Sequence, residues 1–201
     1  MGTRQLNMKL IGVTGSIASG KTTVSKIFSK MGFPVINCDE VYSCLLKENK
    51  NLKLKLIKKF SKFFKNKKIS KHNLYELLLY SDRNLALIEK ITHPFILKEV
   101  FKRIKKIKRR KYKFCVVDIP LLFEKKLQKK FDYTLVVYCS KKTQLERLKR
   151  RKVSKKLLNL LIARQLDIKD KVCLANFVIY NDNVSKIELQ NQLFRLKKFL
   201  T

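Results

Sequence analysis

The sequence predicts one α/β domain in which helices cover both faces of a five-stranded parallel sheet. Its 201 residues suit a single domain with a small insertion. Short apolar runs of strand length alternate with helix-like segments. These runs are apolar throughout instead of alternately polar, which is typical of strands buried on both faces. We therefore expect a three-layer sandwich.

The order of the elements follows from these runs. Strands are expected at residues 8–15, 33–37, 112–120, 132–140 and 176–182. Helices are expected at 21–32, within 141–170 on both sides of a polar break near Lys152–Ser154, and at 185–200. Residues 40–110 contain several helix-like segments and no convincing strand, which is too much helix for one crossover connection. We predict a helical insertion there.

The charge is strongly basic, with 48 Lys and Arg against 15 Asp and Glu and a formal net charge of +33. Clustered cations would indicate a nucleic-acid-binding surface. The lysines instead run through nearly every helix-like segment and do not mark one stripe. This spread favours a general lysine bias, so we expect weak sticking to polyanions and no specific nucleic-acid partner.

The five cysteines are scattered and include no CxxC pair. In a chain without an export signal they indicate reduced thiols in the cytoplasm. No apolar run approaches the ~18 residues of a membrane span. We expect a cytoplasmic protein without a membrane partner, as a monomer or a weak homo-oligomer.

The segment GSIASGKT, residues 15–22, matches the phosphate-loop pattern G-x-x-x-x-G-K-[ST] in full, between an expected strand and an expected helix. Gly15 and Gly20 permit a tight curl, because side chains would block the approach of backbone N–H groups to phosphate oxygens. Lys21 would reach the β- and γ-phosphates, and Thr22 would offer its hydroxyl to Mg²⁺. The expected ATP-binding residues of this segment are Gly15, Ala18, Ser19, Gly20, Lys21, Thr22 and Thr23. The motif predicts a nucleoside triphosphate and leaves the acceptor open.

Two aspartates lie at the carboxyl ends of predicted strands, where ligands of parallel sheets bind: Asp39 follows VIN, and Asp118 ends CVVD. Asp39 is placed to act as a base or orienter for an acceptor hydroxyl; alternatively it caps the next helix. Asp118 resembles the carboxylate that holds Mg²⁺ through water; alternatively it caps a helix at LLFE.

His93 stands before Pro94 in THP, which interrupts a long helical pattern. On the residues alone, a capping or surface histidine is favoured there. Arg147 and Arg151 share one helical face and, on a lid, would offset the γ-phosphate charge. The alternative is a solvated basic face.

The motifs GVTGSIASGKT, VINCD, THP, DIPLLFE, QLERLKRR and ANFVIYN follow one another over about residues 9–199. In this order and spacing they resemble the dephospho-coenzyme A kinase family. The resemblance implies transfer of the ATP γ-phosphate, with Mg²⁺, to the 3′-hydroxyl of dephospho-coenzyme A, the last step of coenzyme A synthesis. It also implies a phosphate-loop core at 8–39 and 111–201, a substrate-binding insertion at 40–110 and a lid at about 141–171.

The resemblance assigns roles to single residues. Asp39 matches the base of the family, and Asn181 matches its asparagine near the adenine of ATP. The implied substrate-binding residues are Asp39, His93, Pro120 and Leu121. The implied catalytic residues are Asp39, Lys21, Arg147 and Arg151, and the implied metal-binding residues are Thr22 and Asp118. The chain departs from the family pattern at Asn37, Cys38, Ser61, Lys71, Leu161 and Asn176, and Arg164 is a candidate replacement for the arginine absent at Leu161.

Two other functions remain open on the sequence. A nucleoside or nucleotide kinase of similar build would phosphorylate nucleoside monophosphates in place of dephospho-coenzyme A. A nucleic-acid-binding ATPase, suggested by the +33 charge, would be stimulated by DNA or RNA, although the chain lacks basic motifs interleaved with aromatic residues.

Overall fold

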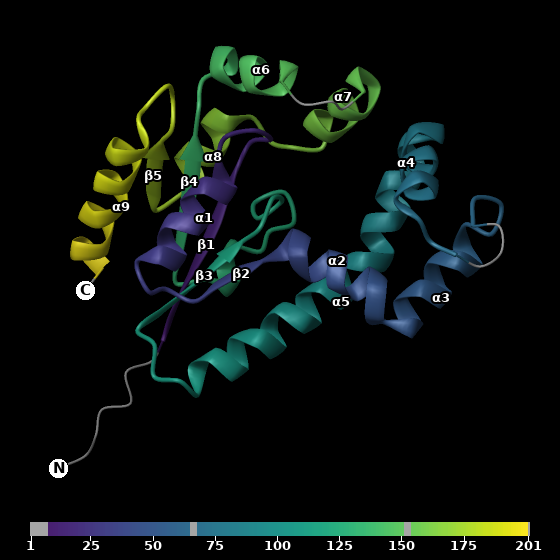
Figure 1. The fold of residues 1–201 in the computed structure, drawn as a ribbon, viewed down its shortest axis with the longest axis horizontal. Coiled ribbons are helices and arrows are strands. Elements are labelled where there is room, and N and C mark those ends of the chain that lie inside the picture. Colours follow the sequence, from purple (N-terminus) through teal and green to yellow (C-terminus); the bar gives the residue numbers. More distant parts are fainter. Residues whose placement is uncertain (1–7, 65–67, 151–153, 201) are drawn as a thin grey trace.

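The computed structural model describes residues 8–64, 68–150 and 154–200, and its described strands form one parallel sheet of five (Figure 1). The strands are β1 (Lys9–Gly15), β2 (Val35–Asn37), β3 (Phe114–Asp118), β4 (Tyr133–Tyr138) and β5 (Phe177–Tyr180). Their order is β2-β3-β1-β4-β5, and every neighbouring pair is parallel. The predicted five-stranded parallel sheet is confirmed. Because β1 lies between β3 and β4, its carboxyl end opens at the switch point where ligands bind.

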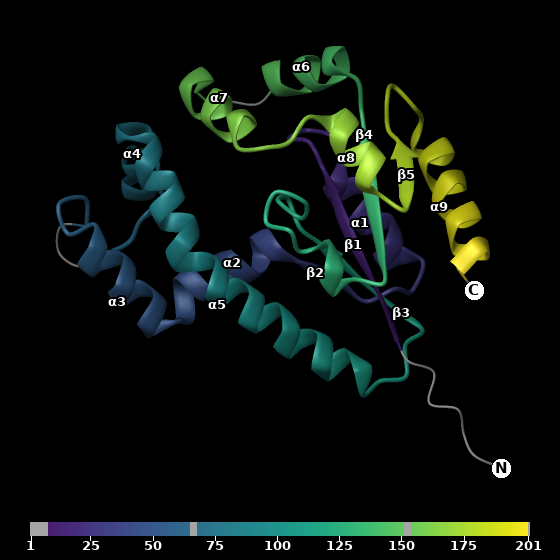
Figure 2. The same ribbon diagram turned by 180° about the vertical axis from the view of Figure 1, so that it is seen from behind.

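Helices fill both faces of this sheet and its carboxyl-terminal edge. They are α1 (Lys21–Lys30), α2 (Cys38–Glu48), α3 (Lys50–Lys59), α4 (Lys71–Tyr80), α5 (Asp82–Lys108), α6 (Lys141–Lys149), α7 (Lys155–Ala163), α8 (Ile168–Leu174) and α9 (Lys186–Leu200). Helices α2 to α5 follow one another between β2 and β3, and α3 and α4 extend away from the sheet (Figures 1 and 2). Helix α7 contacts α4, so the two helical regions meet above the strand ends.

The alternation of side chains along the strands divides the core into two layers. On one face, Ile11 and Val116 pack with apolar residues of α1 and α9. On the other face, Leu10 and Cys115 pack with α2, α5 and α8. Both faces are therefore buried, which is why the strands are apolar throughout.

Three sequence expectations about single elements need correction. Helix α5 continues through Pro94 and is not interrupted there; the proline removes one backbone donor, and the helix bends along its course (Figures 1 and 2). The LLFE segment forms turns and not a helix, so Asp118 does not cap one. The expected helix over 141–170 is divided once more, because α7 ends at Ala163 and α8 begins only at Ile168.

Candidate active site

The phosphate loop joins β1 to α1 and is shaped by glycine at two positions. Gly20 has φ +97°, and a Cβ there would collide with the side-chain amide of Asn181. Gly15 has φ +156°, and its Cβ would lie 2.5 Å from the carbonyl oxygen of Val137. Neither position accommodates a side chain, so the loop can keep its backbone close to its neighbours and to a ligand.

Side chains from α6 and from the residue after β5 hold the phosphate loop by its carbonyl oxygens. Arg147 donates from Nη1 to the carbonyl oxygens of Ala18 (3.3 Å) and Ser19 (3.2 Å). Asn181 donates from Nδ2 to the Ser19 carbonyl (2.7 Å) and accepts from Arg147 Nη2 at its own carbonyl (2.8 Å). Arg147 and Asn181 thus meet at the loop, where the sequence predicted ATP contacts. Arg151 lies outside the described residues.

Two glutamines that the sequence analysis did not single out fix the peptide groups of Ile17. Gln144 of α6 donates to the Ile17 carbonyl (2.9 Å), and Gln165 after α7 accepts from the Ile17 N–H (2.9 Å). Their signal in the sequence is weak, because a glutamine on a helix is ordinarily a solvated residue. The contacts tie both ends of the segment between β4 and α8 to the loop.

Lys21 and the two predicted aspartates share one electrostatic environment. Lys21 Nζ donates to the carbonyl oxygens of Gly15 (3.1 Å) and Ser16 (3.2 Å). Asp118 is buried, and its Oδ2 accepts from Ser25 Oγ (3.1 Å) and from Asn37 Nδ2 (3.4 Å). Burial raises the pKa of Asp118, and the charge of Lys21 only partly opposes this effect.

Asp39 lies in the first turn of α2. The helix is capped by Asn37, whose side chain accepts from the N–H groups of Asp39 (2.8 Å) and Glu40 (3.1 Å). The alternative role of Asp39 as the helix cap is therefore wrong, and its carboxylate is available to a ligand. Surrounding protein raises the pKa of Asp39, Lys21 lowers it in part, and Glu40 adds to the rise.

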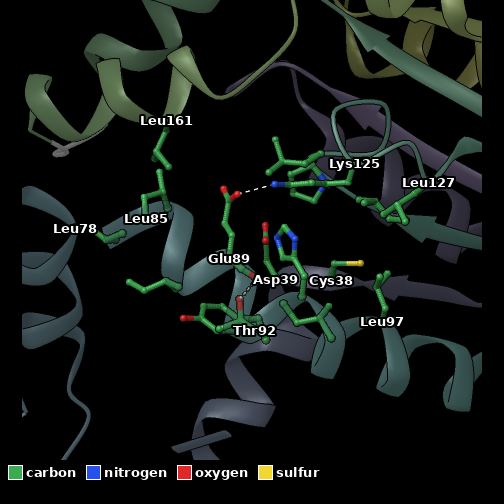
Figure 3. Close-up of a pocket in the computed structure, with 17 residues that line it drawn as sticks. Cys38, Asp39, Leu78, Leu85, Glu89, Thr92, Leu97, Lys125, Leu127 and Leu161 are labelled. Carbon is green, nitrogen blue, oxygen red and sulfur yellow. Dashed lines mark hydrogen bonds and ion pairs between the residues drawn. The ribbon is translucent and has the colours of Figure 1, made fainter. Parts of the chain in front are cut away.

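Two pockets adjoin at Asp39. The first, of about 410 Å³ and here called the phosphate pocket, includes Lys21, Thr22 and Asp118. The second, of about 310 Å³ and here called the apolar pocket, is enclosed by side chains from α2, α4, α5, α7 and the loop after β3 (Figure 3). The residues that line both pockets are Asp39, Glu89, Pro120, Leu121 and Leu161. The four predicted substrate-binding residues, His93 included, line the apolar pocket. The predicted ATP-binding and metal-binding residues that line the phosphate pocket are Ala18, Gly20, Lys21, Thr22, Thr23 and Asp118, whereas Gly15, Ser19 and Asn181 line neither pocket.

Glu89 of α5 organises the junction of the pockets, and the sequence analysis missed it. It accepts from Lys125 Nζ (2.8 Å) and Arg164 Nη2 (3.1 Å), as Figure 3 shows for Lys125. Burial by itself would raise the pKa of Glu89, but the two cations hold it below its ordinary value. The available signal was its position four residues before His93, on the same helical face. Burial lowers the pKa of His93, so the neutral imidazole is favoured in the pocket.

The metal prediction rests on Thr22 and Asp118, which both line the phosphate pocket. Among the described residues, no cluster of three or more His, Cys, Asp or Glu side chains is placed to hold a metal ion. A hydroxyl and one carboxylate nevertheless fit Mg²⁺, which keeps most of its water and takes further oxygens from phosphate groups. The donor set is suited to a metal that arrives with a nucleotide.

Three of the residues that depart from the family pattern, Asn37, Asn176 and Leu161, have defined surroundings in the structure. Asn37 caps α2 and contacts Asp118. Asn176 Oδ1 accepts from the N–H (2.8 Å) and hydroxyl (2.9 Å) of Thr134 at the start of β4. Leu161 lines both pockets, and Arg164 reaches the same junction through Glu89.

Over the described part of the chain, no helix has the length and apolar character of a membrane span.

A parallel sheet of this order, with a phosphate loop after its central strand and a carboxylate facing that loop, defines a P-loop kinase. The family model for dephospho-CoA kinase matches residues 9–186. A dephospho-CoA kinase of Bartonella henselae is 34% identical over 194 residues, which cover 96% of this chain and 99% of that protein. The chain belongs to the dephospho-CoA kinase family.

Solved structures agree with this assignment. The dephospho-CoA kinase from Campylobacter jejuni superposes with a TM-score of 0.65 at 28% identity, covering 96% of this chain and 98% of that one. The protein TT1252 from Thermus thermophilus has a TM-score of 0.80 at 23% identity, covering 97% and 99%, and supports the fold. The expected family, fold class and kinase activity are confirmed.

Proposed function

We propose that this chain transfers the γ-phosphate of ATP to the 3′-hydroxyl of dephospho-coenzyme A, with ATP in the phosphate pocket and the acceptor in the apolar pocket. The observation that carries the proposal is the junction at Asp39, which lines both pockets. A phosphoryl group passing from one pocket to the other would pass beside its carboxylate. Such transfer needs alignment and charge stabilisation more than covalent help from the protein.

The phosphate pocket has the chemistry for the nucleotide. The loop backbone from Gly15 to Gly20 and the N-terminus of α1 would bind phosphate oxygens, and Lys21 would exchange its carbonyl contacts for the β- and γ-phosphates. Thr22 and Asp118 would hold Mg²⁺, which supplies charge neutralisation to the phosphates when bound. Ala18, Ser19, Thr23 and Asn181 complete the proposed ATP site.

The apolar pocket suits the base of the acceptor. A flat adenine ring can pack against side chains such as Tyr42, Ile96 and Leu97 while its ribose faces Asp39. The raised pKa of Asp39 makes its carboxylate a better proton acceptor than an ordinary aspartate. Asp39 would orient the 3′-hydroxyl and accept its proton, with His93, Pro120 and Leu121 on the pocket walls.

The segment 141–171 would act as a lid, and residues 40–110 as the acceptor-binding insertion on a core of 8–39 and 111–201. Closing the lid would exclude water, which would otherwise accept the phosphoryl group. In the closed form, Arg147 and Arg151 would offset charge on the transferred group. We further propose that the protein acts in the cytoplasm as a monomer or weak homo-oligomer.

A coupled ADP-release assay with ATP and dephospho-coenzyme A tests the proposal. Asp39→Asn keeps the size of the side chain and removes its basicity, so we expect kcat to fall about 10²-fold or more. The matched control is Glu48→Gln, because Glu48 is an exposed carboxylate at the end of the same helix and lines neither pocket. Native turnover in Asp39→Asn would exclude Asp39 as the base.

The same assay separates the two alternatives. Faster turnover with nucleoside monophosphates than with dephospho-coenzyme A would indicate a nucleotide kinase. Stimulation of ATP hydrolysis by DNA or RNA, without phosphorylation of dephospho-coenzyme A, would indicate a nucleic-acid-dependent ATPase.

A further inference from the structure

A lysine is completely buried beside the active site. Lys171 of α8 has 0% exposure, and its Nζ lies 2.7 Å from Glu124 Oε1, whose side chain is 9% exposed. Glu124 belongs to the loop after β3 and follows Pro120 and Leu121, which line both pockets. Glu124 Oε1 also accepts from the N–H of Leu166 (3.0 Å). The ion pair therefore joins that loop to residues 164–171, here called the exit segment.

Net stability does not account for a buried ion pair. Removing two charges from water costs about as much as their attraction returns, and apolar residues of similar volume commonly stabilise a protein as well or better. In some proteins a buried ion pair serves instead to fix the position of the groups that it joins. The role of Glu124 and Lys171 should therefore be sought in the geometry that they hold.

The exit segment has three attachments next to the pockets. Gln165 accepts from the Ile17 N–H of the phosphate loop (2.9 Å). Arg164 donates to Glu89 of α5 at the junction of the pockets (3.1 Å). Leu166 donates to Glu124. One short stretch of chain thus contacts the ATP side, the acceptor side and the loop between them.

We propose that Glu124 and Lys171 are positioning residues. They hold the exit segment in the place where Gln165 can contact the phosphate loop and Arg164 can contact Glu89. They act through the exit segment and do not touch the substrates. The proposal rests on the proposed kinase reaction for its effect on turnover. Its effect on ATP binding does not depend on the identity of the acceptor.

The test replaces both charges together, since either one left alone would be buried without a partner. In Glu124→Leu/Lys171→Met we expect a melting temperature near that of the native protein, because apolar residues substitute for the pair. We expect the Kd for ATP, measured by calorimetry, to rise at least fivefold and kcat to fall at least tenfold. Native values of both Kd and kcat in this folded variant would overturn the proposal.

A matched control exists at the opposite end of the sheet. Asp132 Oδ1 pairs with Lys9 Nζ (2.9 Å), and Oδ2 accepts from the N–H of Leu10 (2.8 Å). This pair has the same combination of a lysine and a backbone donor on one carboxylate, but its lysine and aspartate side chains are 49% and 34% exposed. Asp132→Leu/Lys9→Met should leave the Kd for ATP and kcat unchanged; equal losses in this control would overturn the proposal.

Two further variants keep the test decisive if the apolar pair fails to fold. Glu124→Asp keeps the charge but withdraws the carboxylate by one methylene, so Kd and kcat should shift in the same directions by a smaller factor. Gln165→Ala alone should weaken ATP binding, and adding it to the Glu124→Asp variant should cause less than the product of the two losses. Native kinetics in Glu124→Asp, or independent losses in the combination, would overturn the proposal. If ATP binding responds as expected while dephospho-coenzyme A is not phosphorylated, the proposed function fails and the positioning role stands.

Discussion

The phosphate pocket and the apolar pocket share a wall but are built in different ways. The phosphate pocket is built around a run of consecutive loop residues, whose backbone curls at Gly15 and Gly20, and side chains from α2, α5, α7 and the segments after β3 and α7 complete it. The apolar pocket is formed by side chains that come from α2, α4, α5, α7 and the loop after β3. The proposed ATP contacts of the phosphate pocket include main-chain N–H groups, which every sequence possesses. The proposed acceptor contacts of the apolar pocket are side chains, which substitution can exchange. The departure from the family pattern at Cys38, which lines the apolar pocket and not the phosphate pocket, illustrates this difference.

The largest expected effect comes from removing charge in the phosphate pocket. Lys21→Ala should lower kcat with dephospho-coenzyme A about 10³-fold, because a positioned cation on the transferring phosphates contributes about as much as a strong oxyanion donor. The melting temperature should stay near the native value. Lys26→Ala is the control, since Lys26 is exposed on the same helix and does not line the pocket. A loss of less than tenfold in Lys21→Ala would mean that the backbone alone stabilises the transferred group.

The apolar pocket should respond more weakly and only toward the acceptor. Leu97→Gln is expected to raise KM for dephospho-coenzyme A about tenfold, since one apolar contact contributes about 1–3 kcal/mol. KM for ATP should not change, because Leu97 lines the apolar pocket alone. Leu54→Gln on α3, which is exposed and lines neither pocket, is the control. Equal changes in both KM values would show that the two pockets are coupled and not separable.

The smallest expected effect is on stability at Asp118. Burial raises the pKa of this carboxyl above 3.8, so its ionised form is more favourable in the unfolded chain, and stability is lost as pH rises from 3.8 through the folded-state pKa. Asp118→Asn removes this loss and retains an oxygen for Ser25. At neutral pH its melting temperature should exceed that of the native protein, by about 2–4 °C for each kcal/mol gained, while the concentration of Mg²⁺ needed for activity rises.

The pH dependence supplies the control for Asp118→Asn. The difference in melting temperature between Asp118→Asn and the native protein should shrink as pH falls toward the folded-state pKa of Asp118. There the native carboxyl becomes protonated and is uncharged, like the amide that replaces it. Asp170→Asn on the exposed side of α8 should show no gain at any pH. If Asp118→Asn is less stable than the native protein at neutral pH, burial does not make the ionised carboxylate of Asp118 unfavourable for folding, and the interpretation is wrong.

Particular residues show what the sequence could predict about the site. Lys21, Thr22 and Asp118 lie in the phosphate pocket where the loop motif and the strand ends indicated. Glu89 and Lys125, by contrast, are 36 positions apart and were not identified. Each is an ordinary charged residue on its own segment, and only the packing of α5 against the loop after β3 makes them partners. Asn37 was noted as a departure from the family, but its function as the cap of α2 required the structure.

The sequence by itself determined the parallel sheet, the family and the nucleotide half of the site. Strand burial and phosphate binding depend on apolar runs, glycines and a lysine that are neighbours along the chain. A short stretch of sequence is therefore enough to predict them. Only the tertiary structure decided the walls of the apolar pocket, the contacts of Glu89 and the burial of Lys171 against Glu124. Those features depend on how segments tens of residues apart pack together, and no single segment carries that information.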